Sequence, residues 1–477
     1  MFFLLFLFHF SHAKLFRQGL LPPPMTNVPV PQESWFNQTL DHFKPGDTRT
    51  WNQRYWINWE HFRPGGPVLL MIGGEGEANP VWLNAGSWLD YAKKNDAAMM
   101  LLEHRYYGKS HPTPDLSVKN LNWLSSKQAL ADLSRFVVEM QAAHNLTGKW
   151  IALGGSYPGS LAAWSRLKYP HLIAGAVSTS GPLRAKTNFY EYLEVVQNAL
   201  ETTKQGCSEV VKDALKRVKY LTAHRVGWSL LTKKFNLCTP FDGTVLTDVI
   251  NLFESLIGNF EGIVQYNKDN REFEGAKWMN ITVETLCNIM TNPTEGTSLE
   301  RLKIVNDLSL LMAEEKCLDH TYKTQLEELQ GTLWNQTAAV GGRQWTYQTC
   351  TEFGWYQSSE SPLNPFGDII PARFFEYMCS DIFGPRFDIS LLERGVEDTN
   401  TYYGGLDIEV TNVVFVHGSI DPWHAMGITK TNKSGMEAIF IEGTAHCANM
   451  YPGSKDDPEQ LKNARRRIGQ LISQWVK

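Results

Sequence analysis

The sequence lacks the marks of several large protein classes. Beyond the first ten residues, no segment approaches the roughly 18 apolar residues that a membrane-spanning helix needs. The 45 Lys and Arg residues nearly balance 50 Asp and Glu residues, and a net charge of −5 gives no basis for a nucleic-acid or anionic-membrane partner. HExxH and paired Cys-x-x-Cys motifs are absent, so we expect no zinc site and no cofactor. The mature chain is expected to be soluble and globular.

Cysteine is also absent from the first 200 residues, and all seven cysteines lie in the remainder of the chain. In an oxidising compartment six of them could pair, but the sequence alone leaves many connectivities open. Asn-x-Ser/Thr sequences are possible glycan acceptors where they lie on the surface, and they occur at Asn37, Asn145, Asn280, Asn335 and Asn432. Both features favour passage through the secretory pathway.

The N-terminus supports the same interpretation. Residues 1–10 (MFFLLFLFHF) form a short apolar run, and Ser11-His12-Ala13 places small residues three and one before a cleavage point. We therefore expect residues 1–13 to be a signal peptide cut after Ala13, although a basic n-region is missing. The alternative is a buried strand, which would leave an isolated Phe-rich run before a Pro-rich stretch.

The first part of the chain alternates buried-strand and helical patterns. Strands are predicted by apolar or alternating runs at 49–58, 67–73, 97–102, 150–154 and 173–178. Helices are predicted by the spacing of apolar residues at 125–143 and 160–168. Repeated strand and helix units of this length predict a parallel sheet that helices cover on both faces.

The rest of the chain changes character and then returns to this pattern. For roughly 200 residues helical periodicity dominates, and strand patterns resume only at 413–416 and 438–441, before a last helix at about 458–476. Because single cores stop growing at roughly 250 to 300 residues, 477 residues allow a second structural unit. We expect an α/β domain at 14–183 and 401–477, interrupted by a largely helical insertion at 184–400.

A candidate nucleophile lies between a predicted strand and helix. Residues 154–159 (GGSYPG) would form a sharp turn that raises the Ser156 hydroxyl above the sheet edge, at a helix N-terminus that favours negative charge. The G-x-S-x-G pattern is met at Gly154 and Ser156, but Pro158 stands where the last glycine would fall. Gly- and Ser-rich turns are common, so this motif alone is only a moderate indication of catalysis.

The far end of the chain supplies partners for Ser156. A serine hydroxyl needs a base to take its proton, and the base needs an acid to fix its tautomer. Asp421 follows the strand predicted at 413–416, and His446 follows the strand predicted at 438–441. The order Ser, Asp, His is that of α/β-hydrolases. Either residue alone would be better interpreted as a turn former or a packed histidine, but the three together predict a catalytic triad.

Acyl transfer also needs donors for the oxyanion. The backbone N–H of Tyr157 would be the first, and the loop after the strand at 67–73 would supply the second from Glu75 or Gly76. A dinucleotide fingerprint in that loop would need a third glycine where Asn79 stands. A phosphate loop ending at Ser110 would need its first glycine at Glu103, so we reject both nucleotide interpretations.

Several motifs together resemble the Pro-X serine peptidase family, which includes prolyl carboxypeptidase, dipeptidyl peptidase II and, as the most similar branch, the thymus-specific serine protease. The resemblance spans nearly the whole mature chain and rests on WFNQTLDHF (35–43), NQRYW (52–56), EHRYYG (103–108), GGSY (154–157), DPWH (421–424) and AHC (445–447). It implies an α/β-hydrolase domain with a helical, disulfide-bonded cap. It also implies the triad Ser156, Asp421 and His446, with Trp423 in a pocket for proline beside the cleaved bond.

The resemblance has further implications for the cap. It implies the disulfides Cys207–Cys287, Cys238–Cys317 and Cys350–Cys379, which leave Cys447 over. Which peptide end is recognised stays open, and Glu352 is either a partner for a terminal amine or a structural hydrogen-bonding residue.

We therefore predict a secreted or lysosomal serine exopeptidase that acts on peptides with proline next to the cleaved bond. The alternatives are an α/β-hydrolase esterase, since the same triad cleaves esters, and a non-catalytic peptide-binding protein that keeps the fold. The oligomeric state is not readable from the sequence, a homodimer being one option.

Overall fold

The computed structural model describes residues 30–268 and 281–477. In this part of the chain eight strands form one sheet, in the order β1-β2-β4-β3-β5-β6-β9-β10. The strands are β1 (Ser34–Thr39), β2 (Thr50–Asn58), β3 (Val68–Ile72), β4 (Ala98–Leu102), β5 (Trp150–Gly155), β6 (Ile173–Thr179), β9 (Val413–Gly418) and β10 (Met436–Ile441). β1 and β2 pair antiparallel to their neighbours, and all other pairs are parallel.

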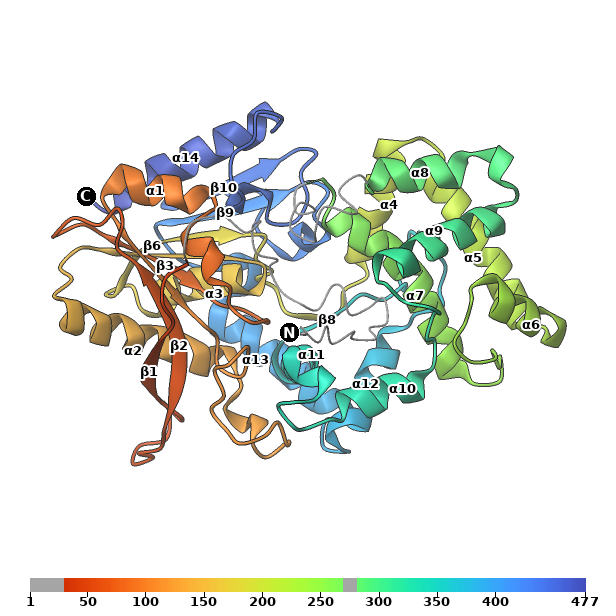
Figure 1. Ribbon diagram of the computed structural model, residues 1–477, viewed down its shortest axis with the longest axis horizontal. Helices are drawn as coiled ribbons and strands as arrows, with labels where there is room; N and C mark the ends of the chain where they lie inside the picture. The colour runs from red at the N-terminus through yellow and green to blue at the C-terminus, as the bar shows by residue number, and fades with distance from the viewer. Residues whose placement is uncertain (1–29, 269–280) are drawn as a thin grey trace, which may run out of the picture.

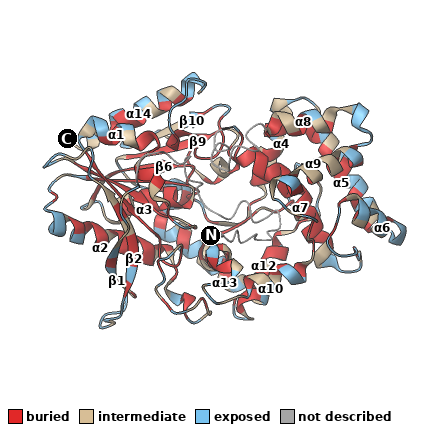
Figure 2. Cartoon of the chain, viewed as in Figure 1, coloured by how far each residue is buried: buried red, intermediate tan, exposed pale blue. Residues whose placement is uncertain are grey.

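Helices cover both faces of the sheet, because the central strands are apolar at the positions that point to one face and also at those that point to the other. Leu70, Met100 and Ala152 face a core that includes α2 (Ser126–His144) and α3 (Tyr157–Lys168). Their neighbours in the strands face a second core with α1 (Ser87–Asn95) and α14 (Glu459–Trp475). Figure 1 shows this three-layered region on the left, and Figure 2 shows that its central strands are largely buried. The predicted α/β-hydrolase fold class is confirmed, with a mixed rather than a wholly parallel sheet.

Differences from the predicted elements have local causes. β1 was missed because its inward-facing position 38 is a glutamine, whose amide donates to the Gln53 side chain at 3.0 Å and to the Asp132 carbonyl at 3.1 Å. Helix α3 begins at Tyr157 rather than at the predicted residue 160, because proline is tolerated in a first helical turn. Helix α1 was not predicted.

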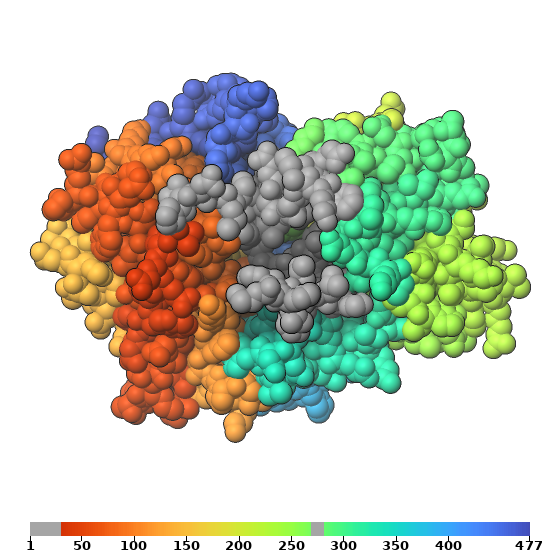
Figure 3. All heavy atoms as spheres, viewed as in Figure 1, coloured from red at the N-terminus to blue at the C-terminus, as the bar shows by residue number. Residues whose placement is uncertain are grey.

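Between β6 and β9 the chain is mostly helical, and Figure 1 shows these helices beside the sheet. In the space-filling view of Figure 3 the same part of the chain, in yellow-green to teal, lies to the right of the red and orange N-terminal part of the sheet region. The helices are α4 (Glu191–Thr203), α5 (Cys207–Thr222), α6 (Arg225–Lys234), α7 (Leu246–Gln265), α8 (Val283–Thr291), α9 (Ser298–Met312), α10 (Tyr322–Leu329), α11 (Gly342–Gln348), α12 (Ala372–Phe383) and α13 (Ile389–Tyr403). Two short strands, β7 (Lys186–Asn188) and β8 (Gly354–Tyr356), pair in parallel. We call residues 184–400 the helical region and the remainder the sheet region.

Three disulfides join elements within the helical region. They link Cys207 to Cys287, Cys238 to Cys317 and Cys350 to Cys379, the pairs that the family resemblance implies. Cys447 is a free, buried cysteine in the sheet region.

Two sets of surface predictions can be placed on the structure. The sequons that lie in the described residues are all exposed, at Asn37, Asn145, Asn335 and Asn432. Asn280 and the expected signal peptide at 1–13 lie outside the described residues. No helix within 30–268 and 281–477 is long and apolar enough to cross a membrane.

Candidate active site

Ser156 occupies a sharp turn between β5 and α3. Its backbone angles, φ 64° and ψ −137°, are ones that residues with a side chain rarely adopt. Glycine at 154 permits the turn, since a Cβ there would lie 2.1 Å from the carbonyl oxygen of Pro158. Gly159 lies against β6, where a Cβ would approach the Thr179 carbonyl oxygen to 2.5 Å. The close approach to β6 therefore falls one residue after Pro158, which explains how the turn forms without glycine at 158.

Asp421 and His446 form a buried pair at the same edge of the sheet. Asp421 follows β9 and His446 follows β10, so both lie beyond the carboxyl ends of parallel strands. His446 Nδ1 and Asp421 Oδ1 are 2.8 Å apart, and the two side chains are 2% and 0% exposed. Burial disfavours the imidazolium, but the Asp421 carboxylate outweighs it and holds the pKa of His446 well above its usual range. For Asp421, burial acts to raise the pKa of the carboxyl, but the neighbouring His446 outweighs burial, and the pKa of Asp421 lies below its ordinary value.

Backbone contacts hold these two loops together. The N–H of Ile420 donates to the Thr444 carbonyl at 3.0 Å. Gly418 allows this approach, because a Cβ there would lie 2.2 Å from the same oxygen. The N–H of Cys447 donates to Ser180 Oγ at 2.9 Å, which ties the histidine loop to the end of β6. The pair is therefore fixed relative to the sheet by its loops.

Glu75 brings a further polar group to Ser156. The Ser156 hydroxyl donates to Glu75 Oε1 at 3.4 Å, and the carboxyl also interacts electrostatically with His446. Glu75 is buried, and burial raises the pKa of its carboxyl above the ordinary value. The sequence suggested only its backbone N–H, as an oxyanion donor. The structure shows in addition that its side chain is a neighbour of the candidate nucleophile.

The loop that carries Glu75 and Gly76 lies beside the serine turn. Residues 73–79 line a small recess together with Gly155 and Pro158, and a Cβ at Gly74 would lie 2.4 Å from Pro158 Cγ. The Glu103 carboxylate, which pairs with Arg54, accepts the N–H of Ala78 at 3.1 Å and so anchors the loop. Tyr157 is the first residue of α3, and the first N–H groups of a helix have no partner within it. Both expected oxyanion segments therefore adjoin Ser156.

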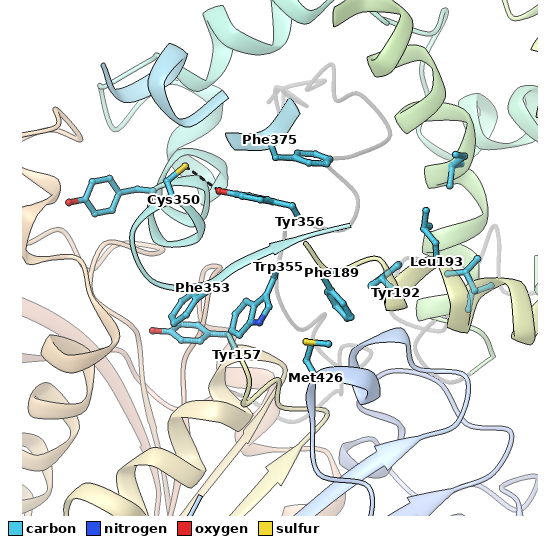
Figure 4. Packing of buried hydrophobic residues seen from close by; sticks show 14 of the residues in the cluster. Tyr157, Phe189, Tyr192, Leu193, Cys350, Phe353, Trp355, Tyr356, Phe375 and Met426 are labelled. Atoms are coloured by element: carbon cyan, nitrogen blue, oxygen red, sulfur yellow. Dashed lines mark hydrogen bonds between the residues drawn. The ribbon is translucent and has the colours of Figure 1, made fainter. Parts of the chain in front are cut away.

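Trp423 lies between the Asp421–His446 pair and the helical region. Its indole N–H donates to Gln265 Oε1 at 2.9 Å. Its ring centroid is 6.5 Å from that of His446, 5.8 Å from that of Trp355 and 5.5 Å from that of Phe189. In Figure 4 Trp355 is seen with Tyr157 on one side of it and Phe189 on the other. An apolar ring of a ligand that contacts Trp423 would therefore also lie near His446.

A cavity of about 110 Å³ opens beside Trp423. Its walls are largely aromatic and include Trp345, Trp355, Tyr356 and Phe375, the last three of which are drawn in Figure 4. The ring of Trp345 is 5.6 Å from that of Tyr157, the residue after Ser156. The cavity thus adjoins the serine turn through Trp345 and the histidine through Trp423.

Glu352 is placed differently from these residues. Its two carboxylate oxygens accept the Ser126 N–H at 2.9 and 3.0 Å, and one of them accepts the Ser126 hydroxyl at 2.7 Å. It is not among the residues that line the cavity. Of the two roles considered for Glu352, these contacts correspond to the structural one. Within 30–268 and 281–477, no three His, Cys, Asp or Glu side chains gather to hold a metal ion.

A protein-family model described as serine carboxypeptidase S28 matches residues 38–468 of this chain. The chain belongs to the serine carboxypeptidase S28 family. It is therefore a serine-type peptidase, and peptides are its substrate class. The match covers the serine turn, the helical region and the Asp421–His446 pair.

Alignments with known relatives cover nearly the whole of this chain. The mouse thymus-specific serine protease is 34% identical over 462 residues, which cover 94% of this chain and 88% of that protein. The mouse lysosomal Pro-X carboxypeptidase is 28% identical over 463 residues, covering 93% and 88% respectively. A solved proline iminopeptidase from Mycobacterium smegmatis aligns over 93% of this chain and 99% of its own, with 12% identity and a TM-score of 0.39. That likeness is too distant to say anything of the chemistry.

Sequence reasoning missed three groups of this S28 site. The Glu75 carboxyl was not predicted because only the folded chain brings the 73–79 loop against Ser156. Gln265, and Glu261, which lines the cavity beside Trp423, were not predicted because they lie in α7, where no motif marks them. A usable sign was present, since polar residues in an otherwise buried apolar helix need a reason for being there.

Proposed function

We propose that this S28 peptidase cleaves peptides by acyl-enzyme catalysis with Ser156 as nucleophile, His446 as base and Asp421 as the acid that orients the histidine. The observation that carries this proposal is the buried 2.8 Å contact between His446 Nδ1 and Asp421 Oδ1, together with the Glu75 carboxyl, which interacts with both Ser156 and His446. Because Asp421 holds Nδ1, proton exchange with the serine falls to Nε2 of His446.

The chemistry follows from these roles. His446 takes the proton of Ser156 as Oγ attacks the scissile carbonyl carbon. The N–H of Tyr157 and an N–H from Glu75 or Gly76 then donate to the oxyanion. His446 returns the proton to the leaving amine, and water, activated by the same histidine, hydrolyses the acyl-enzyme. Asp421 stays ionised and stabilises the imidazolium.

Selectivity in this proposal comes from Trp423 and the aromatic cavity. A pyrrolidine ring is rigid and apolar, so it loses little entropy on binding and gains contact with an indole face. We propose that proline beside the cleaved bond binds against Trp423, and that the enzyme removes residues from a peptide end. The lysosomal Pro-X carboxypeptidase relative, by its name, acts next to proline.

The organisation and location of the protein are part of the proposal. Residues 14–183 and 401–477 would carry the chemistry, and the insertion at 184–400 would shape the substrate pocket. The disulfides of the helical region are consistent with an oxidising compartment. We propose that the protein enters the secretory pathway and acts outside the cell or in lysosomes, glycosylated at exposed sequons.

A single assay tests the specificity. Proline-containing hexapeptides and matched alanine peptides are incubated with the enzyme beside short acyl esters, and the products are identified by mass spectrometry. The proposal expects cleavage next to proline, with release of terminal fragments. Hydrolysis of esters without turnover of any peptide, or cleavage that ignores proline, would contradict it.

A further inference from the structure

Helix α7 presents a row of non-hydrophobic residues, two of them glutamates, to the cavity. Glu254, Gly258 and Glu261 line it, and Gln265 continues the row at the end of the helix. Steps of four, three and four residues place all four positions on one face of an α-helix. The rest of α7 is mainly apolar and buried, so this face is the side that the helix turns toward the substrate pocket.

Gln265 links this row to the candidate catalytic residues. Its side-chain oxygen accepts the indole N–H of Trp423 at 2.9 Å, and its carbonyl accepts the N–H of His446 at 2.9 Å. The end of α7 is therefore in direct contact with both the proposed base and the proposed proline pocket. The position of another α7 residue relative to Trp423 and His446 therefore follows from its distance to Gln265 along the helix axis.

Glu261 is the unusual member of the row. It is only 7% exposed, lines the cavity, and has no hydrogen bond or ion pair among the residues that the structure describes. Burial, and then the charge of Glu254, raise its pKa well above the ordinary value. An ionised carboxylate that is buried without a partner is energetically unfavourable. A cationic ligand would supply the missing partner and stabilise the ionised form.

We propose that Glu261, assisted by Glu254, binds the N-terminal ammonium group of the substrate, so that the enzyme releases N-terminal dipeptides. This inference rests on the proposed function of Ser156 and adds the peptide end that is recognised. The ammonium would sit among aromatic faces, including Trp345 and Trp355, which also attract a cation.

The spacing along α7 matches a dipeptide. Glu261 precedes Gln265 by four residues, which is about 6 Å along a helix axis. Two extended residues span about 7 Å. A proline against Trp423 and one residue before it would therefore bring the chain terminus to the level of Glu261, while a longer peptide would have to displace its terminus beyond it.

The same cavity is poorly suited to a C-terminal carboxylate. Recognition of a carboxylate calls for a cation or several N–H donors. None of the described residues that line this cavity is Lys, Arg or His, whereas two are Glu. The charge of the pocket therefore favours the amine end of a peptide.

The test compares Ala-Pro-aminomethylcoumarin with its N-acetyl derivative. The wild-type enzyme should cleave the free amine at least about tenfold better in kcat/KM. Glu261→Gln keeps the shape of the side chain, and it should lower kcat/KM for the free amine about ten- to a hundredfold, the range for a lost charged hydrogen bond. Cleavage of the N-acetyl substrate should change by less than about twofold. Glu327→Gln is the matched control, because it makes the same change at an exposed position of α10.

Other results overturn the proposal. Equal use of both substrates by the wild type, or an equal loss on both in Glu261→Gln, would show that Glu261 does not read the ammonium. Efficient cleavage of N-acetyl-Lys-Pro-aminomethylcoumarin would assign the site to a side-chain cation instead. Labelling by a serine-reactive fluorophosphonate separates the two proposals: normal labelling with no ammonium preference contradicts only the amine site, whereas no labelling at Ser156 contradicts the proposed chemistry.

Discussion

The sheet region and the helical region are stabilised by different means. In the sheet region the buried side chains of Arg105 and Asp132 form an ion pair at 2.6 Å, and Arg54 pairs with Glu103, which anchors the 73–79 loop. In the helical region three disulfides join segments that are 80, 79 and 29 residues apart in the sequence. The first region depends on strand pairing and buried charge, and the second on covalent links between its helices and loops.

This difference coincides with a division of labour. Ser156, Asp421 and His446 all stand on loops that leave the carboxyl ends of sheet strands. Most residues that line the aromatic cavity come instead from the helical region, with Trp423 as the contribution of the sheet region. Under the proposed function, the sheet region holds the reacting groups and the helical region selects the substrate. Changes in the two regions should therefore have separable effects.

The largest effect is expected from the nucleophile. Ser156→Ala removes one oxygen and almost no volume, so the protein should fold while peptide turnover falls by about a millionfold, as in other triads. Turnover of a proline peptide and the thermal melting midpoint are measured on the same preparation. Substantial turnover by this variant would take Ser156 out of the proposed role.

A somewhat smaller loss is expected at Asp421. Asp421→Asn keeps the shape but favours the wrong tautomer of His446, so kcat should fall by about three to four orders of magnitude. The measurement is single-substrate kinetics on the folded variant, with binding of a proline product to show that the pocket is intact. Activity close to that of the wild type would place the orienting acid elsewhere.

Removing a disulfide should destabilise the helical region without changing the reactivity of Ser156 in the sheet region. Replacing Cys238 and Cys317 together by alanine should lower the free energy of unfolding by about 2 to 5 kcal/mol, as the loss of a native disulfide does. Below its melting temperature the variant should still react with a fluorophosphonate, because the proposed triad stands on the sheet. Denaturant titration and labelling rates check both statements. A parallel loss of Ser156 reactivity would show that the regions are not independent.

The smallest effect, and the most selective one, is expected at Trp423. Trp423→Ala removes an apolar contact of about 1 to 3 kcal/mol, or roughly ten- to two-hundredfold in kcat/KM for a proline substrate. The matched alanine substrate and a small acylating inhibitor should be much less affected. If all three reactions fall equally, Trp423 positions Asp421 and does not form the pocket.

Much of the sheet region could be predicted from the sequence because its elements are local. Continuous apolar runs mark β3, β4 and β5, and the turn at Ser156 shows as glycine beside serine. Strand β1 was hidden because Gln38 is buried through hydrogen bonds that only the folded chain supplies. The loops of Asp421 and His446 were placed correctly because each follows a strand of the same sheet.

The aromatic cavity beside Trp423 could not be predicted in the same way. Glu261, Trp345 and Trp355 come from separate elements, and only the packing of the helical region brings them around one cavity. Nothing in the spacing of these residues indicates that packing. Glu352, which stands in a motif-like stretch, proved instead to be bonded to Ser126.

The central claim, that the sheet region alone supplies the reacting groups, is tested most directly by mapping a fluorophosphonate adduct. The wild-type protein is labelled, digested and sequenced by mass spectrometry, with His446→Ala treated in parallel. The account predicts one adduct, on Ser156, and a much slower reaction in the His446 variant. An adduct on another serine, no adduct at all, or labelling of Ser156 at the same rate without His446 would contradict it.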